Sequence, residues 1–194
     1  MATSTPRPGI RTINDAQALS AMANPFRGRL LDALHLDGPS TASALARRTG
    51  QAVGSVSHHL KVLAEAGLVE EVPELAKDRR ERWWRLVSSG FRWSRAEFAD
   101  DPAAVAAALS AESVGLRRQF ERARDWLDNA EAAGVWDDAA FATQNWLTLS
   151  PEELRTLSEE ILDVLQRWRT RPTPDDEEER ESVYVFARGF PAQP

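Results

Sequence analysis

One stretch constrains the fold more than any other: "TGQAVGSVSHHLKVLAEAGLV", residues 49–69. Gly50 is expected to end a short helix over residues 42–49, because glycine readily adopts the left-handed conformation that follows helix ends. A second helix is predicted from about residue 51 to residue 66, with Gly67 at its end. At 100° per residue, one stripe of that helix is apolar and is expected to be buried: Val53, Val56, Leu60 and Leu63. The stretch therefore predicts two helices joined by a tight turn.

His58 and His59 lie side by side in this helix, and a metal site is the first hypothesis they raise. Neighbouring helical residues diverge by about 100°, whereas ligands that share one ion need a spacing of three or four residues. His35 is the only other histidine, and the chain has no cysteine. We therefore expect no metal and no cofactor. His58 should face outward, and His59 should pack at the edge of the buried stripe.

The surroundings of the two helices predict further elements. Helices are expected over residues 13–23 and from Asn24, an N-cap followed by Pro25, and a Thr41 or Ser40 cap should begin the helix at 42. Two short strands over residues 67–72 and 81–87, joined by a charged loop, predict a β-hairpin. A helix-turn-helix followed by a hairpin is the arrangement of a winged helix-turn-helix.

The segments "TGQAVGSVSHHLKVLAEAGLVEE" and "RRERWWRL" resemble winged helix-turn-helix regulators of the ArsR-like superfamily. The nearest likeness is to a subgroup, common in actinobacteria, with a longer helical C-terminal region. The family pattern is met by seven residues: Ser57, His59, Leu60, Leu63, Gly67, Leu68 and Val69. The resemblance covers about residues 12–95 and implies a dimeric, DNA-binding transcriptional regulator of bacterial type. The metal-binding residues of metal-sensing members are missing, and Ala52 and Val53 stand where many members have Ser or Thr.

Under this interpretation, double-stranded DNA is contacted by two sets of residues. The recognition surface of the second helix comprises Gln51, Ser55, Ser57, His58 and Lys61. Cations of the hairpin are expected to contact phosphates or enter a minor groove: Lys77, Arg79, Arg80 and Arg82. Of the aromatic pair that follows, Trp83 and Trp84, one should cover the core while the other supports the hairpin.

The charge distribution agrees with an anionic partner for the first half of the chain. Residues 1–95 carry 14 Lys and Arg against 9 Asp and Glu, a net +5, while residues 96–194 carry 10 against 21, a net −11. Two domains with differently charged solvated faces would give the same asymmetry. No apolar run is long enough for a membrane span, and residues 1–11 are predicted to be a flexible tail. With no cysteine, a cytoplasmic location is expected.

Residues 96–194 are predicted to be a helical region for dimerisation and possible effector binding. A long helix over residues 101–134 accommodates a heptad seam formed by Leu109, Ser113, Leu116, Phe120, Ala123, Leu127 and Ala130. The seam suits a second subunit, with residues 12–23 as the other dimer element; packing within its own domain is equally open. A capping box at Ser150 should begin another helix, and "WLTL" is expected to pair with "VYVFARGF" as two short strands across an acidic linker, residues 171–182.

The predicted fold class is thus mainly α: a winged helix-turn-helix over 12–95, then a helical region with one long helix and a short β pair. The function expected is that of a homodimeric, sequence-specific transcriptional regulator. No enzymatic activity is expected, because the chain has no nucleophile motif, phosphate loop or cysteine. Two alternatives remain: a protein-interaction module without DNA, or a sensor with an aromatic effector pocket. The pocket would use aromatic residues that could equally form a core: Trp126, Trp136, Phe141, Trp146 and Trp168.

Overall fold

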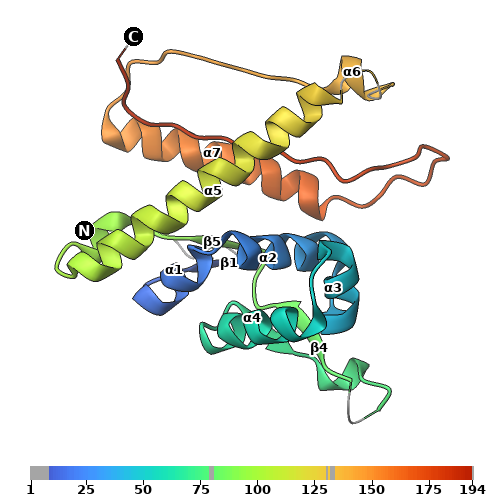
Figure 1. The fold of residues 1–194 in the computed structure, drawn as a ribbon. Helices are drawn as coiled ribbons and strands as arrows, with labels where there is room; N and C mark the ends of the chain where they lie inside the picture. Colours follow the sequence, from blue (N-terminus) through green and yellow to red (C-terminus); the bar gives the residue numbers. More distant parts are fainter. Residues whose placement is uncertain (1–8, 79–80, 130, 132–133, 194) are drawn as a thin grey trace. The chain divides into compact units, whose positions relative to one another are not determined.

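The computed structural model describes residues 9–78, 81–129, 131 and 134–193. Its chain divides into two compact units, residues 1–128 and 129–194 (Figure 1). The long helix predicted after residue 95 packs within the first unit, and the domain boundary after residue 95 stays a prediction. The mainly helical fold class is confirmed.

The first unit begins with four helices: α1 (Ala16–Met22), α2 (Pro25–Asp37), α3 (Ala42–Thr49) and α4 (Val53–Glu65). Three of them are capped by side chains that accept a hydrogen bond from a first-turn backbone N–H. Asp15 caps α1, while Asn24 and Thr41 cap α2 and α3 as predicted. Each cap acts within three residues, so local sequence sets the start of these three helices.

Two small sheets accompany the helices. The hairpin strands β3 (Val69–Glu71) and β4 (Trp83–Leu86) pair antiparallel as predicted, and β2 (Ser40–Thr41) adds a third strand on the other side of β4. The second sheet pairs β1 (Ile10–Thr12) in parallel with β5 (Gly90–Arg92). The prediction of a tail reaching residue 11 is therefore wrong for Ile10 and Arg11, because a partner strand about 80 residues later fixes them.

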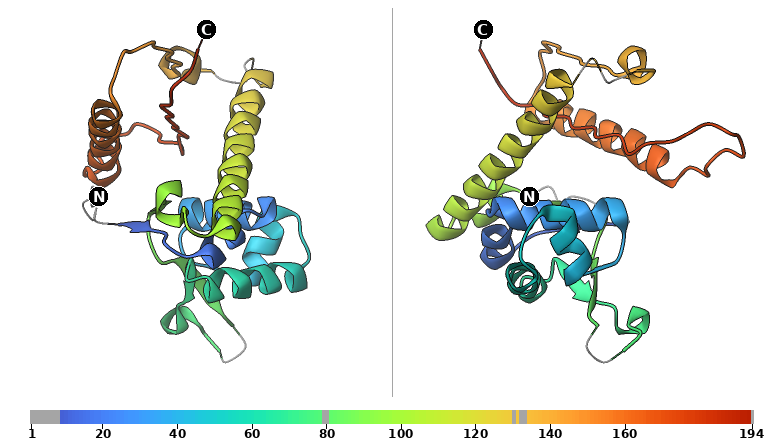
Figure 2. Two further views of the ribbon diagram at one scale, coloured as in Figure 1. Left: turned by 90° about the vertical axis from the view of Figure 1, so that its left-hand side faces the viewer. Right: turned by 45° about the vertical axis from the view of Figure 1, so that its right-hand side comes forward.

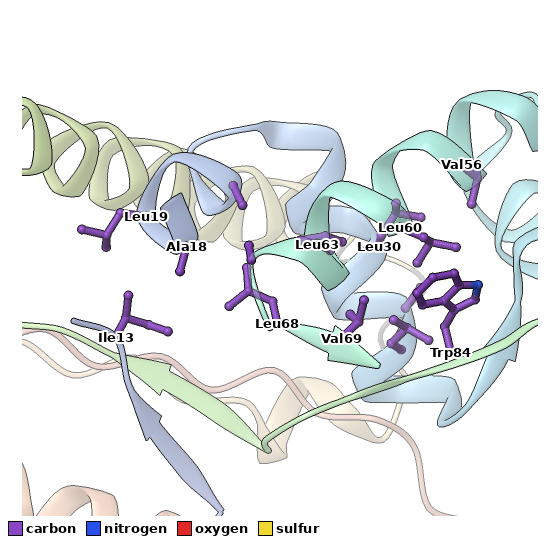
Figure 3. Packing of buried hydrophobic residues seen from close by; sticks show 14 of the residues in the cluster. Ile13, Ala18, Leu19, Leu30, Val56, Leu60, Leu63, Leu68, Val69 and Trp84 are labelled. Carbon is purple, nitrogen blue, oxygen red and sulfur yellow. The ribbon is translucent and has the colours of Figure 1, made fainter. Parts of the chain in front are cut away.

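The core of the first unit lies between α1, α2, α4 and the β3–β4 hairpin (Figure 3). Its largest fully buried side chains come from five elements, the loop before α1 and the turn before β3: Ile13, Leu19, Leu30, Leu45, Val56, Leu60, Leu63, Leu68 and Val69. Trp84 of β4 closes this core beside Val69. Trp83 is half-buried, so the two tryptophans divide as predicted.

Helix α5 (Pro102–Asp128) ends the first unit and has two distinct apolar faces. One face is buried and belongs to the half of the helix that packs on α1: Ala104, Ala108, Ala111 and Val114. The heptad seam is a different face, and its large members Leu109, Phe120 and Leu127 are exposed, at 60% for Phe120 and 70% for Leu127. Leu116, the fourth large member, is half-buried, so packing within the unit covers only part of the seam. Ala130, its last predicted member, lies outside the described residues.

Residues Gly28 and Asp32 of α2 tie α5 to the preceding helices. Arg118 of α5 donates to the Gly28 carbonyl oxygen at 2.9 Å, and Arg118 and Arg122 both form ion pairs with the Asp32 carboxylate. Because α2 also packs against α3 and α4, this cluster links the long helix to the helix-turn-helix.

The second unit contains α6 (Trp136–Ala139) and α7 (Pro151–Thr170). The predicted capping box is confirmed: Ser150 and Glu153 exchange side-chain and backbone hydrogen bonds, which also lowers the pKa of Glu153. The predicted strand pair is wrong, because residues 141–150 and 183–193 are neither strand nor helix. Every residue of both segments is exposed, and two isolated strands without a third layer are too weak to persist.

Among the described helices, none is long and apolar enough to cross a membrane.

Candidate nucleic-acid interface

The turn between α3 and α4 is built around Gly50. Its φ of 65° and ψ of 35° are left-handed, and its N–H and that of Gln51 return to the last carbonyls of α3. Only two residues then separate Gly50 from α4, so the direction of α4 is fixed relative to α3. The turn predicted from Gly50 is confirmed.

Helix α4 has a buried face and an exposed polar face. Val56, Leu60 and Leu63 are fully buried and anchor it on the core. Four of the predicted recognition residues are exposed on or just before the helix: Gln51, Ser55, His58 and Lys61. The fifth, Ser57, is half-buried at the edge of this face. We call these five residues the recognition surface.

The two histidines differ in exposure as predicted, but their rings still meet edge-on, with centroids 5.4 Å apart and planes at 64°. His58 is exposed, whereas His59 is half-buried and its ring packs edge-on against Phe26 of α2, with centroids 5.0 Å apart and planes at 76°. Burial lowers the pKa of His59, and the positive charges of Arg27 and His58 lower it further. The Nδ1 atom of His59 is buried and has no hydrogen-bond partner among the described residues. These features favour a neutral imidazole that packs against α2.

The first turn of α4 differs from the prediction. Val53 was expected to be buried but is 46% exposed, because the helix starts beyond the edge of the core. Ala52, the N-cap, makes no side-chain hydrogen bond to the first turn. An apolar side chain and uncapped N–H groups therefore lie next to the recognition surface.

Two cations beside the recognition surface were missed by the sequence interpretation. Arg47 and Arg48 lie in the last turn of α3, just before Gly50, and both are exposed. Arg48 forms an ion pair with Asp37 at 3.1 Å. Their position directly before the predicted turn was the signal that could have identified them.

The loop of the hairpin, residues 72–82, begins with the short helix η1 (Pro73–Leu75) and is closed by its own acidic residues. Glu81 accepts the backbone N–H of Lys77 at 2.9 Å, and Asp78 accepts that of Glu81 at 3.1 Å. The Lys77 side chain remains exposed. Arg79 and Arg80 lie outside the described residues.

Arg82 and Arg85 lie on the strand side of this loop and are paired. Arg82 forms an ion pair with Glu71 and lies over the Trp84 ring, 5.3 Å from its centroid. Arg85 binds Glu70 at 2.7 Å, a hydrogen bond that raises the pKa of Arg85. Arg82 thus spans β3 and β4 while still half-exposed to solvent.

No group of three or more potential metal ligands gathers within the part of the chain that the structure describes. Of the aromatic residues named for an effector pocket, Trp126, Phe141, Trp146 and Trp168 are exposed, and Trp136 is half-buried. Trp136 donates a hydrogen bond to Glu181 at 2.9 Å.

Residues 22–72 match a family described as a helix-turn-helix domain. The match runs from the end of α1 to just past β3, so it contains the α3–α4 turn and the recognition surface, and it covers about a quarter of the chain. No curated protein matches the chain. The match supports a role in DNA binding and transcription regulation, as expected for the helix-turn-helix.

Proposed function

We propose that the chain is a sequence-specific transcriptional regulator that binds double-stranded DNA as a homodimer, with α4 in the major groove. The observation that carries the proposal is the recognition surface: polar, exposed side chains on a helix whose other face is fully buried in the core. A major groove admits one helix, and base edges there offer donors and acceptors for Gln, Ser, His and Lys side chains.

The neighbouring groups support this docking. Uncapped N–H groups at the start of α4 suit a phosphate, and the exposed Val53 suits a thymine methyl group. Arg47 and Arg48, in the last turn of α3, supply positive charge next to the α3–α4 turn. Lys77, Arg79, Arg80 and Arg82 of the hairpin remain the proposed contacts of a wing with the DNA backbone or minor groove.

A protein that inserts one helix into the major groove makes few base contacts. A dimer that binds two half-sites makes twice as many, so we expect a dimer. The seam of α5, whose Leu109, Phe120 and Leu127 are exposed, is the proposed surface for this association. ArsR-like membership, a bacterial source and a cytoplasmic location are part of the same proposal. It assigns no catalytic chemistry, metal, cofactor or effector to the chain.

The test is a fluorescence-anisotropy titration of the full chain with genomic DNA fragments, beginning with the region upstream of its own gene. Binding should weaken steeply between about 50 and 200 mM salt. Lys61→Ala should weaken it and lower the salt slope by about 1. Arg155→Ala, which removes an exposed cation from α7 in the second unit, is the matched control and should change neither.

A chain that binds no fragment in a salt-sensitive manner would contradict the proposal and favour the protein-interaction alternative. If Lys61→Ala binds DNA with the same affinity and the same salt slope as the wild-type chain, α4 does not contact the DNA.

A further inference from the structure

The second unit lacks a core of its own. Of its described residues, which are 129, 131 and 134–193, none is buried. Large apolar side chains are exposed throughout it, among them Trp146, Leu147, Val183 and Phe190. A unit of this size with no buried side chain cannot offset the entropy of ordering its chain, so another surface must cover it.

Helix α7 presents the most regular of these apolar surfaces. We call it the α7 stripe: Leu157, Ile161, Val164 and Trp168, spaced by four, three and four residues. This is the a/d spacing of a two-helix seam. Exposure increases along the stripe, from half-buried Leu157 through 37% at Ile161 and 42% at Val164 to 61% at Trp168.

The rest of the second unit covers only the start of this face. The chain after α7 turns back and runs alongside the helix (Figure 2), bringing Gly189 next to Leu154, one turn before the stripe. At the other end, Arg171 lies over the Trp168 ring at 4.1 Å from its centroid. Between them, Ile161 and Val164 are exposed.

Charge along α7 is polarised. The first half carries four glutamates and one arginine: Glu152, Glu153, Arg155, Glu159 and Glu160. The last turn and the C-cap carry three arginines: Arg167, Arg169 and Arg171. Two such helices attract each other when antiparallel, because each acidic half then meets a basic half; parallel helices would align like charges.

An antiparallel register satisfies the apolar and charged positions together. Placing Leu157 opposite the partner's Trp168 also places Ile161 opposite the partner's Val164. Because the pair of helices is symmetric, each of these two contacts occurs twice. In this register the flanking Glu160 faces the partner's Arg167.

We propose that the α7 stripe docks against α7 of a second copy of this chain, antiparallel, in the register that pairs residue 157 with residue 168. The inference rests on the proposed homodimer and adds a second, separate contact to it. The self-complementary charge of α7 is what selects a second copy as the occupant.

The absence of cysteine makes a disulfide test specific, since every link must come from introduced residues. Under oxidation, the full chain carrying both Leu157→Cys and Trp168→Cys should form a covalent dimer. Each single variant should remain a monomer on a non-reducing gel, because positions 157 and 168 are 11 residues apart, about 16 Å along a helix. Single variants that link as well as the double variant would indicate parallel helices and overturn the proposal.

A charge reversal tests the same register without oxidation. Glu160→Arg and Arg167→Glu should each weaken dimerisation by about tenfold, and the double variant should recover the wild-type value in sedimentation equilibrium. Asp163→Arg, an equal charge change on the side of α7 away from the stripe, is the control and should have little effect. A double variant that dimerises as weakly as either single variant would contradict the pairing of Glu160 with the partner's Arg167.

The two proposals can fail separately. If the 157/168 double variant links but no DNA is bound, the α7 contact stands and the regulatory function does not. If DNA is bound by a dimer that the double variant fails to link, the function stands and the α7 contact is wrong. A link between Leu157→Cys and Phe120→Cys within one chain would show that α5 covers the stripe, and would also overturn the proposal.

Discussion

Arg118 of α5 occupies the space in which a Cβ at Gly28 of α2 would lie. The close approach lets the Arg118 guanidinium reach the Gly28 carbonyl and Asp32 together. The absence of a side chain at residue 28 is therefore what allows the long helix to be held by α2.

Gly28→Ala should displace Arg118 and lower the free energy of unfolding by about 1 kcal/mol, measured by urea denaturation of the full chain. Gly54→Ala is the matched control: Gly54 also lies in a helix, but a Cβ there meets no atom within 4 Å. Its replacement should raise stability by about 0.5–1 kcal/mol. Equal effects of both replacements would mean that the contact with Arg118 has no energetic weight.

Asp32→Asn should remove the shared partner of Arg118 and Arg122 and destabilise the first unit by about 1–3 kcal/mol, since a charged hydrogen-bond acceptor is lost from a partly buried cluster. The comparison is Asp37→Asn, which breaks the more exposed pair with Arg48 and should cost no more than about 0.5 kcal/mol. Thermal unfolding at low salt measures both.

Stability should fall on acidification because of His59. Its pKa in the folded chain lies below the unfolded value of about 6.5, so the unfolded state binds a proton more readily as the pH falls. The contribution of His59 is full above pH ~6.5 and is lost as the pH falls through the lowered pKa. His59→Gln should flatten the dependence of unfolding free energy on pH between about 7 and 5; the exposed His35→Gln should leave the slope as it is.

Leu60→Ala should destabilise the chain by about 2–5 kcal/mol, because Leu60 is fully buried between α4 and the core. Val53→Ala, in the same helix but exposed, should change stability by no more than about 0.5 kcal/mol while weakening DNA binding. Denaturation and anisotropy on the same samples separate the two effects. A large loss of stability in Val53→Ala would indicate that the Val53 side chain is buried together with the apolar stripe of α4.

His58→Ala should reduce affinity for the preferred DNA site by about 1–3 kcal/mol with little change on unrelated DNA. His35→Ala, another exposed histidine, serves as the control. A uniform loss on all sequences would show that His58 contacts phosphates rather than bases.

Local signals in the sequence predicted local structure well. Asn24, Thr41 and Ser150 begin helices because a cap acts within three residues. The helical angle alone predicted that His58 is exposed and that His59 packs at the edge of the buried face. The same angle placed Val53 in the stripe, but periodicity does not reveal where the core ends.

Signals that depend on distant partners were missed or misjudged. Strand β1 has only three residues and exists because β5 lies beside it. The apolar alternation in "WLTL" and "VYVFARGF" predicted strands, although no layer within the second unit buries them. Arg79 and Arg80 remain predictions, as does every DNA contact.

The parallel pairing of β1 with β5 also bears on the order in which the first unit assembles. The contacts of α3 with α4 close loops of a few residues, whereas Ile10 meets Gly90 across 80 positions. Loop-closure entropy grows with that separation, so the helix-turn-helix can form early and the β1–β5 seam should be among the last native contacts to appear. During synthesis, β1 cannot complete its pairing with β5 until Arg92 has left the ribosome.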